Sequence, residues 1–99
     1  MPRTGEYNLP NLFQVKNYRV FFWSNENDEP IHVHISKGRP MPNSTKIWIT
    51  SEGGCIIANN NGRIPRRELN ELLEIISAQY YLICGEWEEH FRKDIKYYC

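Results

Sequence analysis

The chain has 99 residues, with 12 Lys and Arg against 12 Asp and Glu, so its formal net charge is zero. This length allows one domain with a single core and excludes a core plus an independent second unit. The balanced charge excludes a strongly basic protein, so nucleic-acid binding would have to come from local clusters of charge. Three cysteines without a Cys-x-x-Cys pair fit a reducing compartment. We therefore expect a cytoplasmic protein that does not enter a membrane.

The first half of the chain is typical of β-structure. Residues 1–10 are polar and contain two prolines, so we expect an N-terminal arm followed by one domain over residues 11–99. Turn-forming residues separate a series of β-prone or alternating stretches. They predict strands at residues 11–15, 18–24, 31–35, 45–50 and 55–58. The result is an antiparallel meander of four or five strands.

From Pro65 onward the hydrophobic period changes from 2 to about 3.6, which predicts helix. Pro65 suits the first position of a helix, where its missing N–H is not needed. We expect one long helix or two consecutive ones, with a break at Gln79–Tyr80 or at Gly85. Helices that follow a meander predict an α+β domain, with the helical layer on one face of the sheet. The apolar helical stripe is formed by Leu69, Leu73, Ile76, Tyr80, Ile83, Trp87 and Phe91.

Two histidines one residue apart, His32 and His34, are the most informative local feature of the sequence. Side chains alternate along a strand, so both imidazoles point to the same face of the sheet. Val33 and its neighbours Ile31 and Ile35 then line the opposite face, beneath the helices. We expect the two histidines to lie on an open sheet face.

Three interpretations of this histidine pair remain open. The first is structural: the rings are half-buried polar groups that form hydrogen bonds. The second is a metal site, since both imidazoles can reach one ion, but a third ligand is then needed. The candidates for that ligand are His90, Cys55, Asp28 and Glu29. The third is acid–base catalysis, because histidine titrates near neutral pH.

Catalysis on a phosphate would also need a cation, and three arginines surround the start of the predicted helix. The helix dipole is positive there, so their placement is unfavourable unless an anion or a carboxylate relieves it. A bound phosphate is one explanation. The alternative is that Arg63, Arg66 and Arg67 are solvated or pair with Glu68 and Glu71.

The face that carries the histidines is also aromatic and basic. Trp23 and Trp48 could stack on unpaired bases, as in proteins that bind single strands through a sheet. The basic residues that could contact the nucleic-acid backbone, or a protein partner, are Arg19, Lys37, Arg39, Lys46, Arg63 and Arg66. Exposed tryptophan is equally typical of a homodimer or partner interface.

Residues 18–26 followed by Glu29-Pro30-Ile31-His32-Val33-His34-Ile35 resemble a small prokaryotic family known only as domain of unknown function 4160. The other sequence features of this family follow in the expected order, and the resemblance covers about residues 12–92. Many members have Pro-Pro before the first histidine, whereas Ile31 follows Pro30 here. The resemblance implies a bacterial toxin-type component encoded beside a small partner protein, and it implies no particular reaction.

The leading hypothesis is a toxin–antitoxin-type protein that binds or cleaves RNA without a metal or another cofactor. One of His32 and His34 would accept the 2′-hydroxyl proton and the other would protonate the leaving oxygen. Arg67 would stabilise the phosphorane charge. One alternative is a non-catalytic interaction module that binds a partner or a second copy of itself. The other is a His-x-His metal-binding protein.

Overall fold

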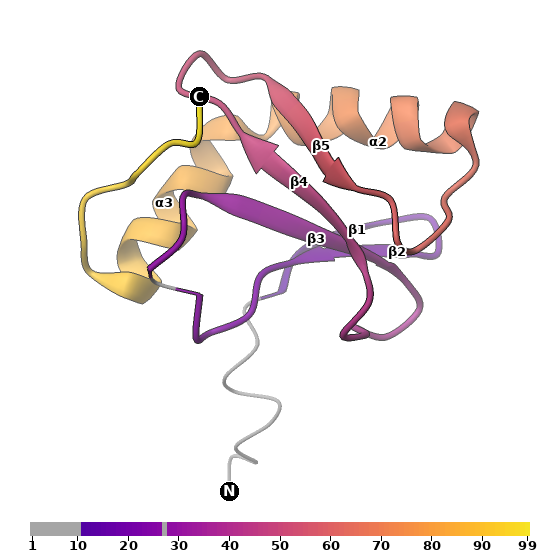
Figure 1. Ribbon diagram of the computed structural model, residues 1–99, viewed down its shortest axis with the longest axis horizontal. Coiled ribbons are helices and arrows are strands. Elements are labelled where there is room, and N and C mark those ends of the chain that lie inside the picture. The colour runs from indigo at the N-terminus through magenta and orange to yellow at the C-terminus, as the bar shows by residue number, and fades with distance from the viewer. Residues whose placement is uncertain (1–10, 27) are drawn as a thin grey trace, which may run out of the picture.

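A computed structural model of the protein describes residues 11–26 and 28–99. It contains one antiparallel sheet with the strand order β1-β2-β3-β4-β5, followed by a pair of helices (Figure 1). The elements are β1 (Asn11–Val15), β2 (Tyr18–Phe21), β3 (His32–Lys37), β4 (Thr45–Ile49), β5 (Cys55–Asn59), α2 (Arg66–Ala78) and α3 (Tyr80–Phe91). The predicted α+β meander with a C-terminal helix pair is confirmed. The expected arm, residues 1–10, lies outside the described residues.

The bounds of β2 and β3 differ most from the prediction, and β4 and β5 each differ by one residue at their ends. β2 ends at Phe21 rather than at residue 24, because the Trp23 N–H donates to the Glu26 carboxylate at 2.8 Å instead of extending the ladder. β3 begins at His32 and continues to Lys37, pairing with β2 up to the register Tyr18↔Lys37. The segment that leaves β2 therefore turns early and returns toward β3.

The hydrophobic core lies between the sheet and the helices. Val33, Ile35 and Ile47 are fully buried on the sheet face that the helices cover. They pack with the buried residues of the helices, which are Leu69, Leu72, Ile76, Ile83 and Trp87. Burying one such side chain contributes about 1.5–3 kcal/mol. Leu72 lies outside the predicted stripe, and the predicted members Leu73, Tyr80 and Phe91 are only partly buried. The helices therefore cover the Val33 side of the sheet, as the sequence predicts, and Trp87 of α3 also reaches the His32 ring at the start of β3.

The helical half breaks at the first of the two predicted positions. Gln79 leaves helical geometry at the end of α2, and its N–H donates to the carbonyls of Ile75 and Ile76. α3 starts at the next residue and contains Gly85 in its interior. It ends at Phe91, and the next residue, Arg92, adopts the left-handed conformation with φ of 56°.

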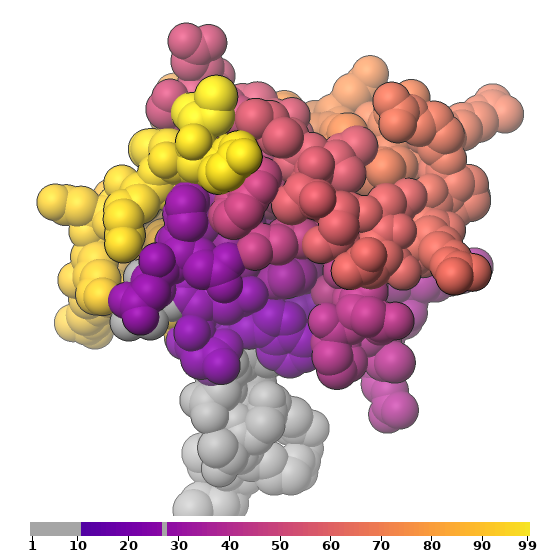
Figure 2. Space-filling view, viewed as in Figure 1, coloured from indigo at the N-terminus to yellow at the C-terminus, as the bar shows by residue number. Residues whose placement is uncertain are grey.

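The residues after α3 run back alongside the sheet and contact it (Figure 1). The Ile31 N–H donates to the carbonyl of Lys96 at 2.8 Å, and the Ser51 N–H donates to that of Cys99 at 3.0 Å. Figure 2 shows these last residues in yellow against the purple and magenta residues around the start of β3 and the β4–β5 turn. This C-terminal segment ties the end of the chain to β3 and to the β4–β5 turn.

Candidate functional site

β3 presents His32 and His34 on the face of the sheet opposite the Val33 core. The two rings lie close together, with centroids 5.0 Å apart and planes nearly perpendicular. Val33 between them is fully buried on the helix side. Strand alternation alone places the two imidazoles on one face, as expected from the sequence.

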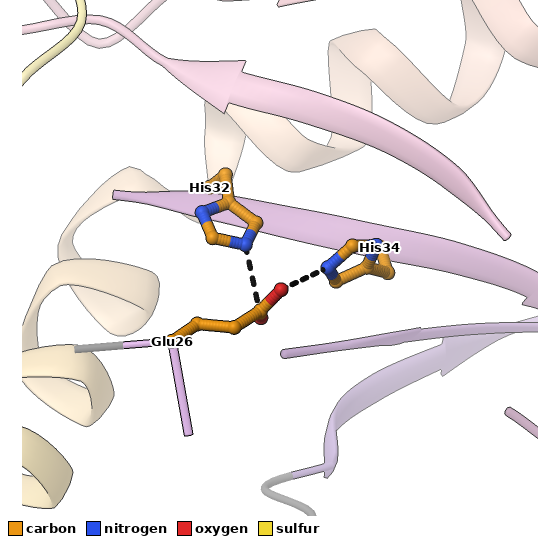
Figure 3. Close-up of side chains that lie close together, drawn as sticks. All are labelled: Glu26, His32 and His34. Atoms are coloured by element: carbon orange, nitrogen blue, oxygen red, sulfur yellow. Dashed lines mark hydrogen bonds and ion pairs between the residues drawn. The ribbon is translucent and has the colours of Figure 1, made fainter. Parts of the chain in front are cut away.

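The face around the histidines is not open, so that part of the prediction is wrong. His32 has no solvent-exposed surface, and only 7% of the surface of His34 is exposed to solvent. The β2–β3 connection, which leaves β2 early, folds over this face and brings Glu26 down onto the two rings (Figure 3). Period-two alternation assigns a side chain to a face, but it cannot show what covers that face.

Glu26 is the residue that joins the two histidines. One carboxylate oxygen, Oε1, lies 2.9 Å from His32 Nε2, and the other, Oε2, lies 2.8 Å from His34 Nε2 (Figure 3). The Trp23 N–H also donates to Oε1, at 2.8 Å, and fixes the position of the carboxylate. The structure therefore assembles a Glu26–His32–His34 cluster that the sequence did not identify as a unit.

The proton positions on His32 follow from its second ring nitrogen. Nδ1 lies 2.8 Å from the carbonyl oxygen of Pro30, which can only accept a hydrogen bond, so Nδ1 carries a hydrogen. In a neutral ring Nε2 then presents a lone pair to a carboxylate oxygen. Two lone pairs at 2.9 Å repel each other. The contact requires a positive species at Nε2, which is either a proton or a metal ion.

The carboxylate itself is ionised at neutral pH. Burial acts to raise the pKa of Glu26, but the hydrogen bonds and the charges of His32 and His34 outweigh it and lower the pKa to about 2. Glu26 therefore faces the two histidine rings as a negatively charged carboxylate.

Aromatic side chains surround the cluster. The Phe21 ring stacks on His34 with centroids 5.5 Å apart, and Trp48 and Trp87 meet His32 edge-on at 5.6 and 5.3 Å. This shell excludes water and lowers the local dielectric, so charges within it interact strongly. His34 Nδ1 is buried in it without a hydrogen-bond partner among the described residues.

Lys46 lies beside the cluster on the neighbouring strand. It is the β4 residue directly across from His34, and its ammonium lies 2.6 Å from Glu29 Oε1. The same ammonium sits 4.3 Å from the centroid of the Trp48 ring, a cation–π contact.

The three arginines at the helix start are not brought to the histidines. Arg63, Arg66 and Arg67 are exposed around the beginning of α2, which covers the other face of the sheet. No ion pair to Glu68 or Glu71 forms within the described part of the chain. Glu68 instead accepts a hydrogen bond from the Tyr18 hydroxyl.

The remaining residues of the predicted binding face are dispersed. Lys37 and Arg39 are exposed at and beyond the end of β3, and Arg19 is half-buried on β2 across from Ser36. Trp23 and Trp48 are half-buried, and Tyr98 from the C-terminal segment stacks on Trp48. The structure therefore does not present these two tryptophans as an open aromatic platform.

None of the third ligands considered from the sequence belongs to the cluster. Glu29 pairs with Lys46, and Asp28 is exposed with Lys93 3.8 Å away. Cys55 contacts Ser77 at 3.5 Å, and His90 is exposed on α3. Glu26 lies in the same acidic loop as two of these candidates. Sequence spacing could not show which carboxylate of this connection turns inward.

Comparison with known protein families gives a match over most of the chain. A family described as Domain of unknown function (DUF4160) matches residues 17–88, a range that contains the whole Glu26–His32–His34 cluster. No curated protein and no solved structure matches the chain. Neither α2 nor α3, the helices of the described ranges, has the length and apolar character needed to cross a membrane.

Proposed function

The chain belongs to the family described as Domain of unknown function (DUF4160), and we propose that its function is to bind a divalent transition-metal ion through Glu26, His32 and His34. One observation carries this proposal. Ligand atoms of the three residues all lie within 4.8 Å of one another. His32 Nε2 and Glu26 Oε1 also face each other at 2.9 Å, in a contact that needs a positive species.

The donor set suits such an ion. Imidazole nitrogen and carboxylate oxygen bind zinc and similar metals at about 2.0–2.1 Å, which places neighbouring ligands of a tetrahedral site about 3.3 Å apart. The two histidine–carboxylate separations, 2.9 and 2.8 Å, run to different oxygens of Glu26 and are a few tenths of an ångström shorter than this. Ligand atoms of the three residues lie within 4.8 Å of one another, so small side-chain shifts bring them to one ion. The hydrogen bond from His32 Nδ1 to the Pro30 carbonyl is the outer contact that a metal-bound histidine ordinarily makes.

The competing explanation is a proton at His32 Nε2, which turns the cluster into a buried ion pair that fastens the β2–β3 connection to β3. Isothermal titration of metal-free protein, made without a histidine tag, with Zn²⁺ or Co²⁺ separates the two. We expect one ion per chain, and we expect Glu26→Gln and His34→Ala to weaken binding by at least about tenfold. Glu29→Gln is the matched control because its carboxylate faces Lys46. Wild-type protein that binds no stoichiometric metal would leave the ion pair as the explanation.

The RNA-directed toxin hypothesis stays a prediction, and so do a small partner protein, a homodimer and a cytoplasmic location. Two features make RNA cleavage by this cluster less favourable than metal binding. His32 is fully buried, and Arg67 lies on a helix across the sheet. RNA cleavage in EDTA that is lost in both His32→Ala and His34→Ala would nevertheless support the ribonuclease. Light scattering with and without the protein encoded by the neighbouring gene tests the interaction module.

A further inference from the structure

The cluster supplies three ligands to a metal that ordinarily takes four. Within residues 11–26 and 28–99, Glu26, His32 and His34 form the one group of three ligating side chains. Zinc sites with three protein ligands keep the fourth position for water or an exogenous ligand. Resting on the metal site proposed above, we propose that this position takes a small oxyanion and that Lys46 holds it there.

The balance of charge favours an anion at the fourth position. A divalent ion with the Glu26 carboxylate leaves one positive charge, and the Lys46–Glu29 pair adds no net charge. This positive charge sits among the Phe21, Trp48 and Trp87 rings, where an uncompensated ion is costly. A monoanion neutralises it, whereas a neutral water molecule does not.

Lys46 is placed to bind that anion. It faces the same side of the sheet as His34, its direct cross-strand neighbour, and its ammonium rests over the Trp48 ring that touches His32. An ammonium has three N–H donors, and the Glu29 carboxylate accepts one of them. The others are available to an oxygen of a metal-bound anion.

The burial of the cluster limits the size of the ligand. The side chains of His34 and Glu26 keep 9% and 11% of their surface exposed, and that of His32 keeps none. Access is therefore from the Glu26 and His34 side, and it is narrow. The ligand class is a small oxyanion such as formate, acetate or inorganic phosphate, and a polymer does not fit.

The visible absorption of the Co²⁺-loaded full chain tests this inference, because the cobalt bands respond to a change in the fourth ligand. Titration with formate, acetate and inorganic phosphate should shift the bands saturably for at least one of them. Lys46→Gln should bind that anion at least tenfold more weakly, whereas Lys37→Gln, an exposed lysine at the end of β3, should match wild type. Glu29→Gln should bind the anion more tightly, since it releases the Lys46 ammonium.

The outcomes separate this inference from the proposed function. If Co²⁺ binds and none of the anions shifts the bands, the metal site stands and the anion site is wrong. The role of Lys46 is likewise wrong if Lys46→Gln and Glu29→Gln, each with an unaltered anion-free spectrum, both bind the anion as wild type does. If Co²⁺ does not bind, both proposals fail together.

Discussion

Tyr98 lies flat on Trp48, with ring centroids 4.8 Å apart and ring planes within 6° of each other. Trp48 in turn meets the His32 ring edge-on at 5.6 Å. The last residues of the chain therefore complete the aromatic shell on one side of the buried cluster. The hydrogen bond from the Ile31 N–H to the Lys96 carbonyl holds this arrangement next to the start of β3.

Replacing Tyr98 with Ala should uncover Trp48 and shift tryptophan fluorescence to longer wavelength. The lost ring contact should lower the free energy of unfolding by about 0.5–1.5 kcal/mol. Urea denaturation followed by fluorescence measures both effects. Tyr81→Ala is the control, because that side chain on α3 is 85% exposed. Equal spectra for the two variants would contradict the shielding of Trp48.

The two faces of the sheet should differ in their tolerance of truncation. Ile47→Ala should destabilise the protein by about 2–5 kcal/mol, because Ile47 is fully buried beneath the helices and its loss leaves a cavity. Ile56 is half-buried on the opposite face, across from Trp48. Ile56→Ala should therefore lower the free energy of unfolding by less than half as much as Ile47→Ala does. Urea denaturation of both variants measures the difference, and similar losses would contradict the assignment of the core.

Tyr18 should make the stability depend on alkaline pH. Burial, followed by the hydrogen bond to Glu68 and the charge of that carboxylate, raises the pKa of Tyr18 to about 12. The pKa of Tyr18 is therefore higher in the folded state than in the unfolded state, where it is near 10. The stability that this difference contributes is fully present below pH 10, and it is lost as the pH rises toward 12. Tyr18→Phe should therefore be less stable than wild type at pH 7 by about 1.5 kcal/mol.

The difference in free energy of unfolding between wild type and Tyr18→Phe should become smaller as the pH increases from 10 to 12. Urea denaturation of both proteins at several pH values gives this difference directly, and contributions from other tyrosines and from lysines cancel in it. A gap that stays constant over this range would show that Tyr18 does not titrate as described.

Metal should stabilise the folded chain by mass action. Zn²⁺ at one hundred times its dissociation constant should raise the free energy of unfolding by about 2.7 kcal/mol, and EDTA should remove the gain. Glu26→Gln should respond weakly, because it loses the ligand that joins the two histidines. Thermal unfolding at a series of zinc concentrations provides the measurement. An equal rise in melting temperature for wild type and Glu26→Gln would place the zinc elsewhere on the protein.

Much of the fold followed from local patterns. The order of the strands, the helix pair and the break at Gln79 all depend on residues close in sequence. The early end of β2 did not. Phe22 and Trp23 have high β propensity, yet Phe22 packs into the core and the Trp23 N–H donates to Glu26 instead of to a neighbouring strand. Tertiary contacts overrode propensity at that point.

The sequence by itself determined that His32 and His34 share one face, because side-chain alternation is a property of any extended backbone. Only the tertiary structure decided that this face is covered, that Glu26 rather than Glu29 joins the two rings, and that Arg67 lies across the sheet. These depend on how the β2–β3 connection and the C-terminal segment pack, through contacts between residues distant in the chain such as Trp48 and Tyr98. Local periodicity carries no information about such contacts.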